Sequence, residues 1–313
     1  MAQSLFYIFI FPGFLFLSVI AMFGEYVDRI LYARFQNRQG PPWFQPFADF
    51  IKLTAKEDII PAEADQKMFK MMPVLALTSV LCAYLYIPLW SPDALFSFKG
   101  DLIVVIYLLT IPTLTFFLGG WYSASLFSMI GAIRSLTQLF AYEVPLFMAV
   151  LAPAMLADTW SLREIVLFYN ARPVYCLFNI IGFMVSIVIL LGKLEKVPFD
   201  SPEAETEVVG GTFTEYGGRF LAFFRWAIDI EMIVGSSLVA AVFLPFGMEL
   251  TPVLGFVLYL VKILFIISIM ALIRSVAARF RIEQMLKFSW KYLAPAALLQ
   301  LLINIIAKGF LGI

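Results

Sequence analysis

Long apolar runs alternate with short polar segments along most of this 313-residue chain. A helix that crosses a membrane needs about 20 mostly apolar residues, and five charge-free runs meet or approach that length. Three more runs become spans if a nearby charge is tolerated. Eight spans are therefore predicted, at about residues 4–24, 71–91, 102–120, 136–157, 173–192, 230–248, 252–273 and 291–310.

The limits of the spans follow from local signals. The apolar run 102–133 is too long for one span, and Gly119, Gly120 and Ser123 predict that a helix ends there and a loop begins. The first 24 residues lack a basic leader and a convincing cleavage site, so we expect a retained first helix. Without a linker or an internal repeat, residues 1–313 should form one all-α membrane domain with short amphipathic helices beside the spans.

Composition agrees with a membrane protein and narrows its chemistry. The chain is 62% hydrophobic and only 14% charged, with a net charge of zero, which gives no argument for nucleic-acid binding. It has no histidine and only two cysteines, Cys82 and Cys176, too few for an iron–sulfur cluster or bis-histidine haem. We interpret both cysteines as buried small apolar side chains and expect no metal or redox cofactor in this chain.

The basic residues predict the orientation in the membrane. The loops after the first, third, fifth and seventh spans hold 17 lysines and arginines, whereas the loops on the other side hold three. Cytoplasmic loops of membrane proteins carry the excess of basic residues. We therefore expect a protein of the plasma membrane with both termini outside the cell and the large loops in the cytoplasm.

The first cytoplasmic loop contains the segment "PPWFQPFADFIKLTAKEDIIP". Its prolines are followed by Phe44, Phe47, Phe50, Ile51 and Leu53, which are spaced like one face of a helix. This pattern predicts a short amphipathic helix at the membrane interface. That helix either lies on lipid or offers a docking face to a soluble partner.

Two charges fall inside predicted spans. Glu143 lies in "LFAYEVPLFMAV", where an ionised carboxylate is costly and a functional, inward-facing role is the default interpretation. The alternative is a structural glutamate that is either protonated or in contact with water. Pro145, two residues later, is expected to loosen the helix locally. Lys262 presents the same problem with opposite sign, and it either pairs with a carboxylate or extends toward the interface.

The segment "EKVPFDSPEAETEVVGG" gathers acids in an otherwise apolar chain. Ser201 and Pro202 predict a helix start, which would place Glu203 and Glu207 on one face as a like-charged pair able to hold and pass protons. A solvated acidic loop is the alternative. Beyond it, Asp229 and Glu231 are expected at the entrance of the sixth span, continuing a polar path inward.

Several segments together resemble the membrane subunit beside the quinone site of respiratory complex I, a type shared with membrane-bound [NiFe] hydrogenases. The resemblance lies in the acidic loop with its continuation "GTFTEYGG", and in "ARFQNRQGPP", "QPFADFIKLTAKEDIIPAEAD", "GAIRSLTQLFAYEVPL" and "LVKILFIISIMALIRSVAARFRIEQMLKFSWKYLAP". It extends from about residue 25 to residue 295. The family has eight spans with both termini outside, as predicted above.

The resemblance also implies roles for individual residues. It implies a proton path between a redox arm and antiporter-like membrane subunits, and a surface beneath that arm. The path residues are Glu143, Glu203, Glu205 and Glu207, with Asp229, Glu231 and Lys262 as further candidates; the arm-facing residues are Arg29, Arg34, Arg38, Asp200 and Glu215.

The chain departs from the quinone-using branch at three places. That branch has Glu-Thr-Asn-Arg before its Pro-Phe-Asp motif, where this chain has residues 193–196 as Lys-Leu-Glu-Lys, and its first loop is longer than "RQGPPWFQP" here. At the start of the sixth span that branch has Ala-Glu-Tyr, where this chain has "AIDIE". The compact loop resembles the hydrogenase branch. The expected function is therefore an anchor and coupling subunit of an ion-translocating oxidoreductase. The resemblance implies hydrogenase-like large and small soluble partners with iron–sulfur clusters, with or without a nickel–iron centre.

Two other functions remain open from the sequence. The chain would form part of a quinone cavity if it belonged to a quinone-reducing complex. A stand-alone secondary transporter would also explain Glu143 and Lys262, but such transporters commonly show internal repeats, which this sequence lacks.

Overall fold

The computed structural model describes residues 2–311, without the side chains of residues 2–4, 205, 206 and 311. In this described part the chain is helical and has no strand. Its α-helices are α1 (Ala2–Phe9), α2 (Phe14–Phe35), α3 (Gln45–Thr54), α4 (Gln66–Leu85), α5 (Asp101–Tyr122), α6 (Leu126–Ala157), α7 (Leu162–Ala171), α8 (Ile180–Lys193), α9 (Glu205–Val208), α10 (Gly218–Phe243), α11 (Pro252–Val276), α12 (Ile282–Phe288) and α13 (Ala294–Leu311). Short 3-10 turns η1 (Pro173–Asn179) and η2 (Gly211–Phe213) and a π-helical turn η3 (Ser289–Leu293) complete it.

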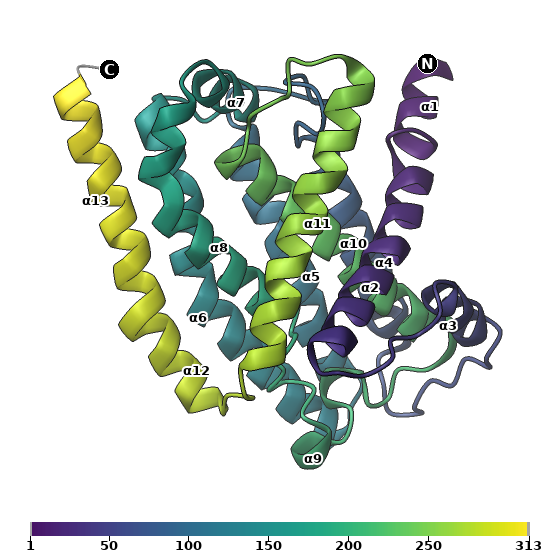
Figure 1. Cartoon of the computed structure of the whole chain (residues 1–313). Helices are drawn as coiled ribbons and strands as arrows, with labels where there is room; N and C mark the ends of the chain where they lie inside the picture. Colours follow the sequence, from purple (N-terminus) through teal and green to yellow (C-terminus); the bar gives the residue numbers. More distant parts are fainter. Residues whose placement is uncertain (1, 312–313) are drawn as a thin grey trace.

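Eight helical segments are long and apolar enough to cross a membrane, which confirms the predicted fold class. Both described ends of the chain lie at the same end of the bundle as α7, and α3, α9 and α12 lie at the opposite end (Figure 1). The helix turns and loops rich in basic residues therefore share one end, which we call the basal end.

Four spans extend well beyond the predicted limits. The first continues along α2 to Phe35, and the sixth begins at Gly218 and ends at Phe243, before Pro245. The fourth begins with α6 at Leu126, and the eighth begins with α12 at Ile282. In α2 and α10 the added turns contain charged side chains that face the protein interior, so average hydropathy understates how far these helices continue. Asp229 and Glu231 consequently lie within α10 rather than at its entrance.

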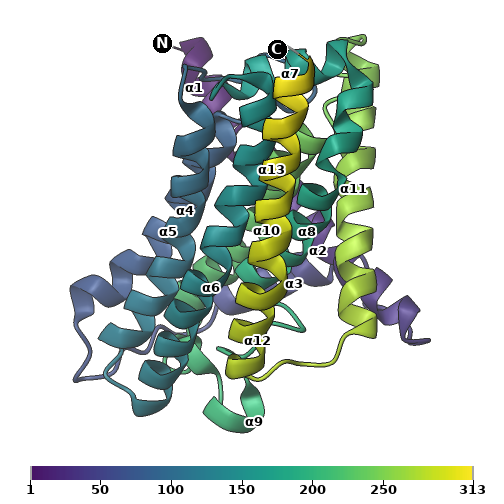
Figure 2. The same ribbon diagram turned by 90° about the vertical axis from the view of Figure 1, so that its left-hand side faces the viewer.

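Helix α10 forms the centre of the bundle. Every residue from Ile230 to Phe243 is buried, and the helix packs against α2, α4, α8 and α11. At the periphery, α13 packs along α6, and it crosses in front of that part of the bundle in Figure 2. Glu231, the charged residue in this stretch of α10, is thus shielded from both lipid and solvent.

The predicted interfacial helix is present as α3. The ring centroid of Phe50 lies 4.9 Å from that of Trp226 in α10, and the ring centroid of Phe47 lies 5.9 Å from that of Phe23 in α2. Ile51 is exposed. The interpretation of the cysteines is wrong: Cys82 is exposed on α4 and Cys176 is only partly buried. Apolar character does not place a residue inside a membrane protein, because its outer face is also apolar.

Candidate functional site

The acidic segment folds as a tight loop across the basal end. Helix α8 ends at Lys193, and the loop returns on itself where Gly211 crosses Pro202. Gly211 has φ +55°, and a Cβ there would lie 1.9 Å from the Pro202 carbonyl oxygen. Only glycine fits this crossing, which holds the acidic loop against α6.

The predicted pair of Glu203 and Glu207 is not formed. The helix in this loop is only Glu205–Val208; its N-cap is Ala204, and the Ser201 hydroxyl donates to Gln138 outside this helix. Glu203 forms an ion pair with Arg225 at 3.2 Å.

Glu207 extends away to Arg134, with an N–O distance of 2.6 Å. The two acids therefore do not share a helical face, and each has its own cation. The structure does not describe the Glu205 side chain.

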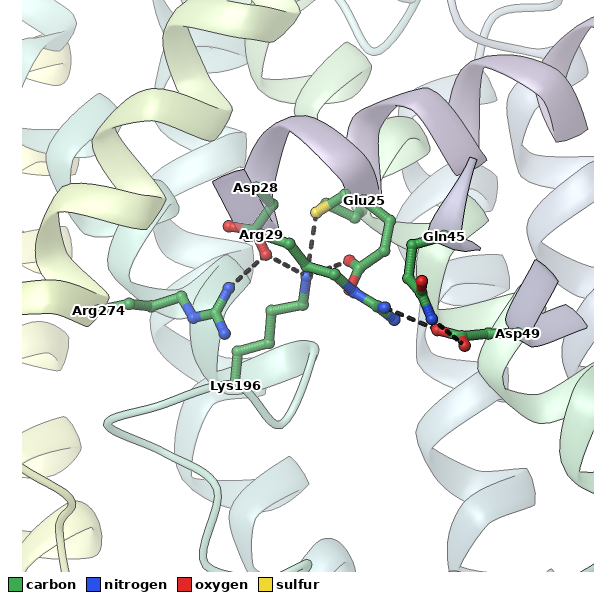
Figure 3. Close-up of polar contacts among 8 residues, drawn as sticks. Glu25, Asp28, Arg29, Gln45, Asp49, Lys196 and Arg274 are labelled. Carbon is green, nitrogen blue, oxygen red and sulfur yellow. Dashed lines mark hydrogen bonds and ion pairs between the residues drawn. The ribbon is translucent and has the colours of Figure 1, made fainter. Parts of the chain in front are cut away.

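A cluster of alternating charges surrounds residues 25–29 in the second half of α2 (Figure 3). We call it the α2 ion cluster. The Lys196 amino group donates to Asp28 at 2.7 Å and to Glu25 at 2.9 Å. Its members are Glu25, Asp28, Arg29, Asp49, Lys196 and Arg274.

The remaining contacts of this cluster tie four elements together. Arg29 bridges Glu25 on its own helix, at 2.7 Å, and Asp49 on α3, at 2.8 Å. Arg274 of α11 pairs with Asp28. Burial alone would lower the pKa of Lys196, but the carboxylates of Asp28 and Glu25 outweigh burial and raise it. Lys196 is therefore a fixed cation at neutral pH.

Deeper in the bundle, Glu143 of α6, Lys193 of α8 and Glu231 of α10 form a second group, the intramembrane triad. The Lys193 amino group lies 3.4 Å from a Glu231 oxygen, and both side chains are almost completely buried, at 2% and 0% exposure. Lys193 also donates to the Leu109 carbonyl and lies 5.8 Å from the Tyr142 ring centroid.

Glu143 joins this triad through its charge. Both of its carboxyl oxygens are buried and have no hydrogen-bond partner among the described residues, and Lys193 is the cation whose field acts on it. Pro145 lacks the N–H that would bond to the Ala141 carbonyl. The buried Ser289 hydroxyl, from the π-helical turn, donates to that carbonyl instead. The helix beside Glu143 is thus opened and then held by the segment that leads into α13.

Glu195 stands in the chain between Lys193 of the triad and Lys196 of the α2 ion cluster. Its carboxyl accepts a 2.5 Å hydrogen bond from Ser135 of α6, and the side chain is almost fully buried. Burial, followed by repulsion from Glu203, raises its pKa to about 8, although the Ser135 hydrogen bond opposes this rise. A carboxyl of this kind exchanges protons near neutral pH.

A cavity of about 510 Å³ at the basal end is lined by Glu195 and by five of the six members of the α2 ion cluster. Eleven of its twenty lining residues are charged, an unusual lining for a site that binds an apolar molecule. The predicted residues Arg29, Asp200, Glu203 and Asp229 all line it. Asp200 is held there by a double contact with Arg279.

The other predicted residues lie elsewhere. Arg34 and Arg38 are exposed beyond the α2 ion cluster, and Glu215 is half-buried in the loop before α10. Lys262 donates to the Phe246 carbonyl at 2.6 Å and, among the described residues, has no carboxylate partner. The structure does not bring Lys262 into the group that contains Glu143.

Seven residues of these clusters are not predicted by the sequence: Glu25, Asp28, Asp49, Lys193, Glu195, Lys196 and Arg274. A signal exists for Glu25, because Arg29 follows it by four residues, the spacing of a helical ion pair. Residues 193, 195 and 196 stand out in the sequence only as departures from a family pattern. Their partners, on four different helices, have no signature in the local sequence.

The chain as a whole is similar to known membrane subunits. The family model described as NADH dehydrogenase matches residues 8–305. The chain is 35% identical to NADH-quinone oxidoreductase subunit 8 of Thermus thermophilus, covering 90% of this chain and 81% of the relative. It is 33% identical to an NADH-quinone oxidoreductase subunit of Dehalococcoides mccartyi, covering 95% of this chain and 85% of the relative.

A solved structure has a similar fold. A chain in the structure of the membrane-bound sulfane sulfur reductase, an archaeal respiratory membrane complex, superimposes with a TM-score of 0.85. The match covers 97% of this chain and 98% of that one at 24% sequence identity.

Proposed function

This chain belongs to the NADH dehydrogenase family of membrane subunits, the subunit 1 type of complex I-like oxidoreductases, and we propose that it couples electron transfer in a soluble arm to ion movement across the membrane. It is a multi-pass membrane subunit of a respiratory complex. The ion is a proton, or a sodium ion exchanged for protons by antiporter-like neighbours. Electron transfer takes place in hydrogenase-like soluble partners that carry iron–sulfur clusters.

One observation carries this proposal: ionisable side chains form a series from the basal end into the membrane interior. The charged cavity opens among Glu203, Asp229 and the α2 ion cluster, Glu195 lines its wall, and the intramembrane triad follows. Buried charges are costly inside a membrane and are retained where they serve transport. The carboxyl groups in this series supply proton acceptors of different affinity along one route.

The proposed arrangement in the cell follows from the distribution of basic residues. The basal end carries the loops that hold 17 lysines and arginines, and we place it in the cytoplasm, with both termini outside. Exposed Arg34 and Arg38, with exposed Ile51 of α3, then face the soluble arm. This surface supports docking of an acidic, partly apolar partner.

A quinone site is the second candidate, favoured by the relatives named as NADH-quinone oxidoreductase subunits and by Phe50 and Trp226 in the cavity wall. The charged lining favours water and protons over a quinone with an apolar tail. Hydrogenase-type partners are therefore proposed ahead of quinone-reducing ones.

Two measurements on the purified, intact complex test these proposals. When the complex is reconstituted in liposomes and supplied with an electron donor and acceptor, turnover should generate an ion gradient that an uncoupler or ionophore abolishes. Turnover without any proton or sodium uptake would refute coupling. Nickel in the complex would support the hydrogenase branch, whereas competitive inhibition by a quinone analogue, lost on substitution of Asp200, would favour the second candidate.

A further inference from the structure

The turn at residues 193–196 sends three ionisable side chains in three directions. Lys193, the last residue of α8, extends toward Glu231 in the intramembrane triad. Lys196 extends toward the α2 ion cluster. Glu195, between them, adopts φ +50°, a left-handed conformation that is uncommon and strained for a residue with a side chain. The strained turn directs its carboxyl against α6.

The surroundings of Glu195 differ from those of Glu25 and Asp200, two other acids in the cavity wall. Glu25 and Asp200 each have a cation within hydrogen-bond distance, whereas Glu195 has no ion pair among the described residues. One oxygen accepts from Ser135, and the other is buried without a partner. A buried, unpaired carboxylate is unfavourable, so this group favours the protonated form and has a free oxygen to carry the proton.

Charged groups surround Glu195 on several elements. Glu203 of the acidic loop and Arg225 of α10 act on it from the cavity, and Glu231 of α10 acts on it from the membrane interior. From α6 it meets the neutral Ser135. Glu195 therefore faces the cavity on one side and the field of the triad on the other.

We propose that Glu195 is the proton-transferring residue between the cavity and the intramembrane triad, an inference that rests on the proposed coupling function. A proton from cavity water binds the unpartnered oxygen of the Glu195 carboxylate. The neutral carboxyl then releases that proton, through water, to a carboxylate of the triad and returns to its charged form. No electron is transferred, and no other bond is broken.

The test uses the intact complex in liposomes. Glu195→Gln keeps the volume and an oxygen for Ser135 but cannot carry the proton; Glu195→Asp keeps a titrating group. In Glu195→Gln, electron transfer to an artificial acceptor should stay close to the wild-type rate. Ion uptake should fall at least about tenfold, which is less than the rate factor that a positioned proton-transferring group commonly contributes. Glu195→Asp should retain more uptake than Glu195→Gln. The exposed Glu63, changed to glutamine, is the matched control and should leave uptake unchanged.

The outcomes distinguish failure of the coupling function from failure of the Glu195 role. If the wild-type complex turns over without ion uptake, the coupling function itself fails. If the wild type transports ions and the assembled Glu195→Gln complex transports them equally well, only the role of Glu195 is overturned.

Ser135→Ala provides a second test if Glu195→Gln does not assemble. Because the hydroxyl stabilises the charged carboxylate, its loss should shift the pH dependence of ion uptake upward. An unchanged pH profile in an assembled Ser135→Ala complex would also overturn the proposal.

Discussion

The buried ion pair of the intramembrane triad gives the sharpest prediction about stability. Lys193→Met removes the cation but keeps an unbranched side chain of similar length. It leaves Glu231, whose side chain is fully buried, without a countercharge, since the 3.4 Å pair is the only polar contact of its carboxyl oxygens within residues 2–311. Breaking such a pair from one side costs about 3–5 kcal/mol.

The double variant Lys193→Met with Glu231→Gln removes both charges. The desolvation cost of the orphaned carboxylate then disappears, and most of the lost stability should return, because replacing a buried pair by neutral side chains is often close to neutral. Glu231→Gln alone should cost less than Lys193→Met, about 1–3 kcal/mol, since Lys193 keeps the Leu109 carbonyl and the Tyr142 ring.

Thermal dissociation of the purified complex, together with the fraction of this subunit incorporated, measures the effect. The expected order of stability is wild type, double variant, then Lys193→Met. The reasoning would be refuted if Lys193→Met were as stable as the double variant, because Glu231 would then need no cation.

Three further predictions follow from other parts of the chain. Ser289→Ala leaves the Ala141 carbonyl, next to Pro145, without its hydrogen bond and should lower the free energy of unfolding by about 1–3 kcal/mol, measured by thermal unfolding. Ser275→Ala, at a partly exposed serine, is the control, and an equal loss in both variants would contradict a stabilising role of the Ser289 hydrogen bond. Burial raises the pKa of Glu195 from 4.5 to about 8, so the wild type should lose stability relative to Glu195→Gln as pH rises from about 4.5 to 8 and not below; a pH-independent difference would argue against that pKa. Single cysteines at position 2 and in the loop 277–281, in a background without native cysteines, should be labelled from opposite sides of the membrane by an impermeant reagent, and labelling of both from one side would exclude the proposed topology.

The number of spans could be predicted from sequence because hydropathy is a local property. Helix α5 ends at Tyr122, next to the predicted Gly119–Ser123 signal, and α3 forms where aromatic residues recur at helical spacing. The limits of α2 and α10 could not be predicted in the same way. In α2 the stretch beyond the predicted limit carries acids such as Glu25, which pairs with the distant Lys196, and a hydropathy window cannot recognise such a partner.

The candidate site was predictable only in part. An acid within a span, such as Glu143, is conspicuous from sequence, and the structure does place it in a buried polar group. The pairing of Glu203 with Glu207 failed because Arg225 and Arg134, more than 15 residues away from either, separate them. Glu195 could not be singled out, since its inward direction depends on one left-handed residue.

Ion uptake by a Glu143→Gln complex tests the central claim most directly. Glutamine keeps the volume and polarity of the side chain but removes the titrating proton. In one preparation of vesicles, assembly, electron transfer to an artificial acceptor and ion uptake are measured together. Assembly and electron transfer should remain near wild type, and ion uptake should fall at least about tenfold. An assembled Glu143→Gln complex that takes up ions at the wild-type rate would contradict the account.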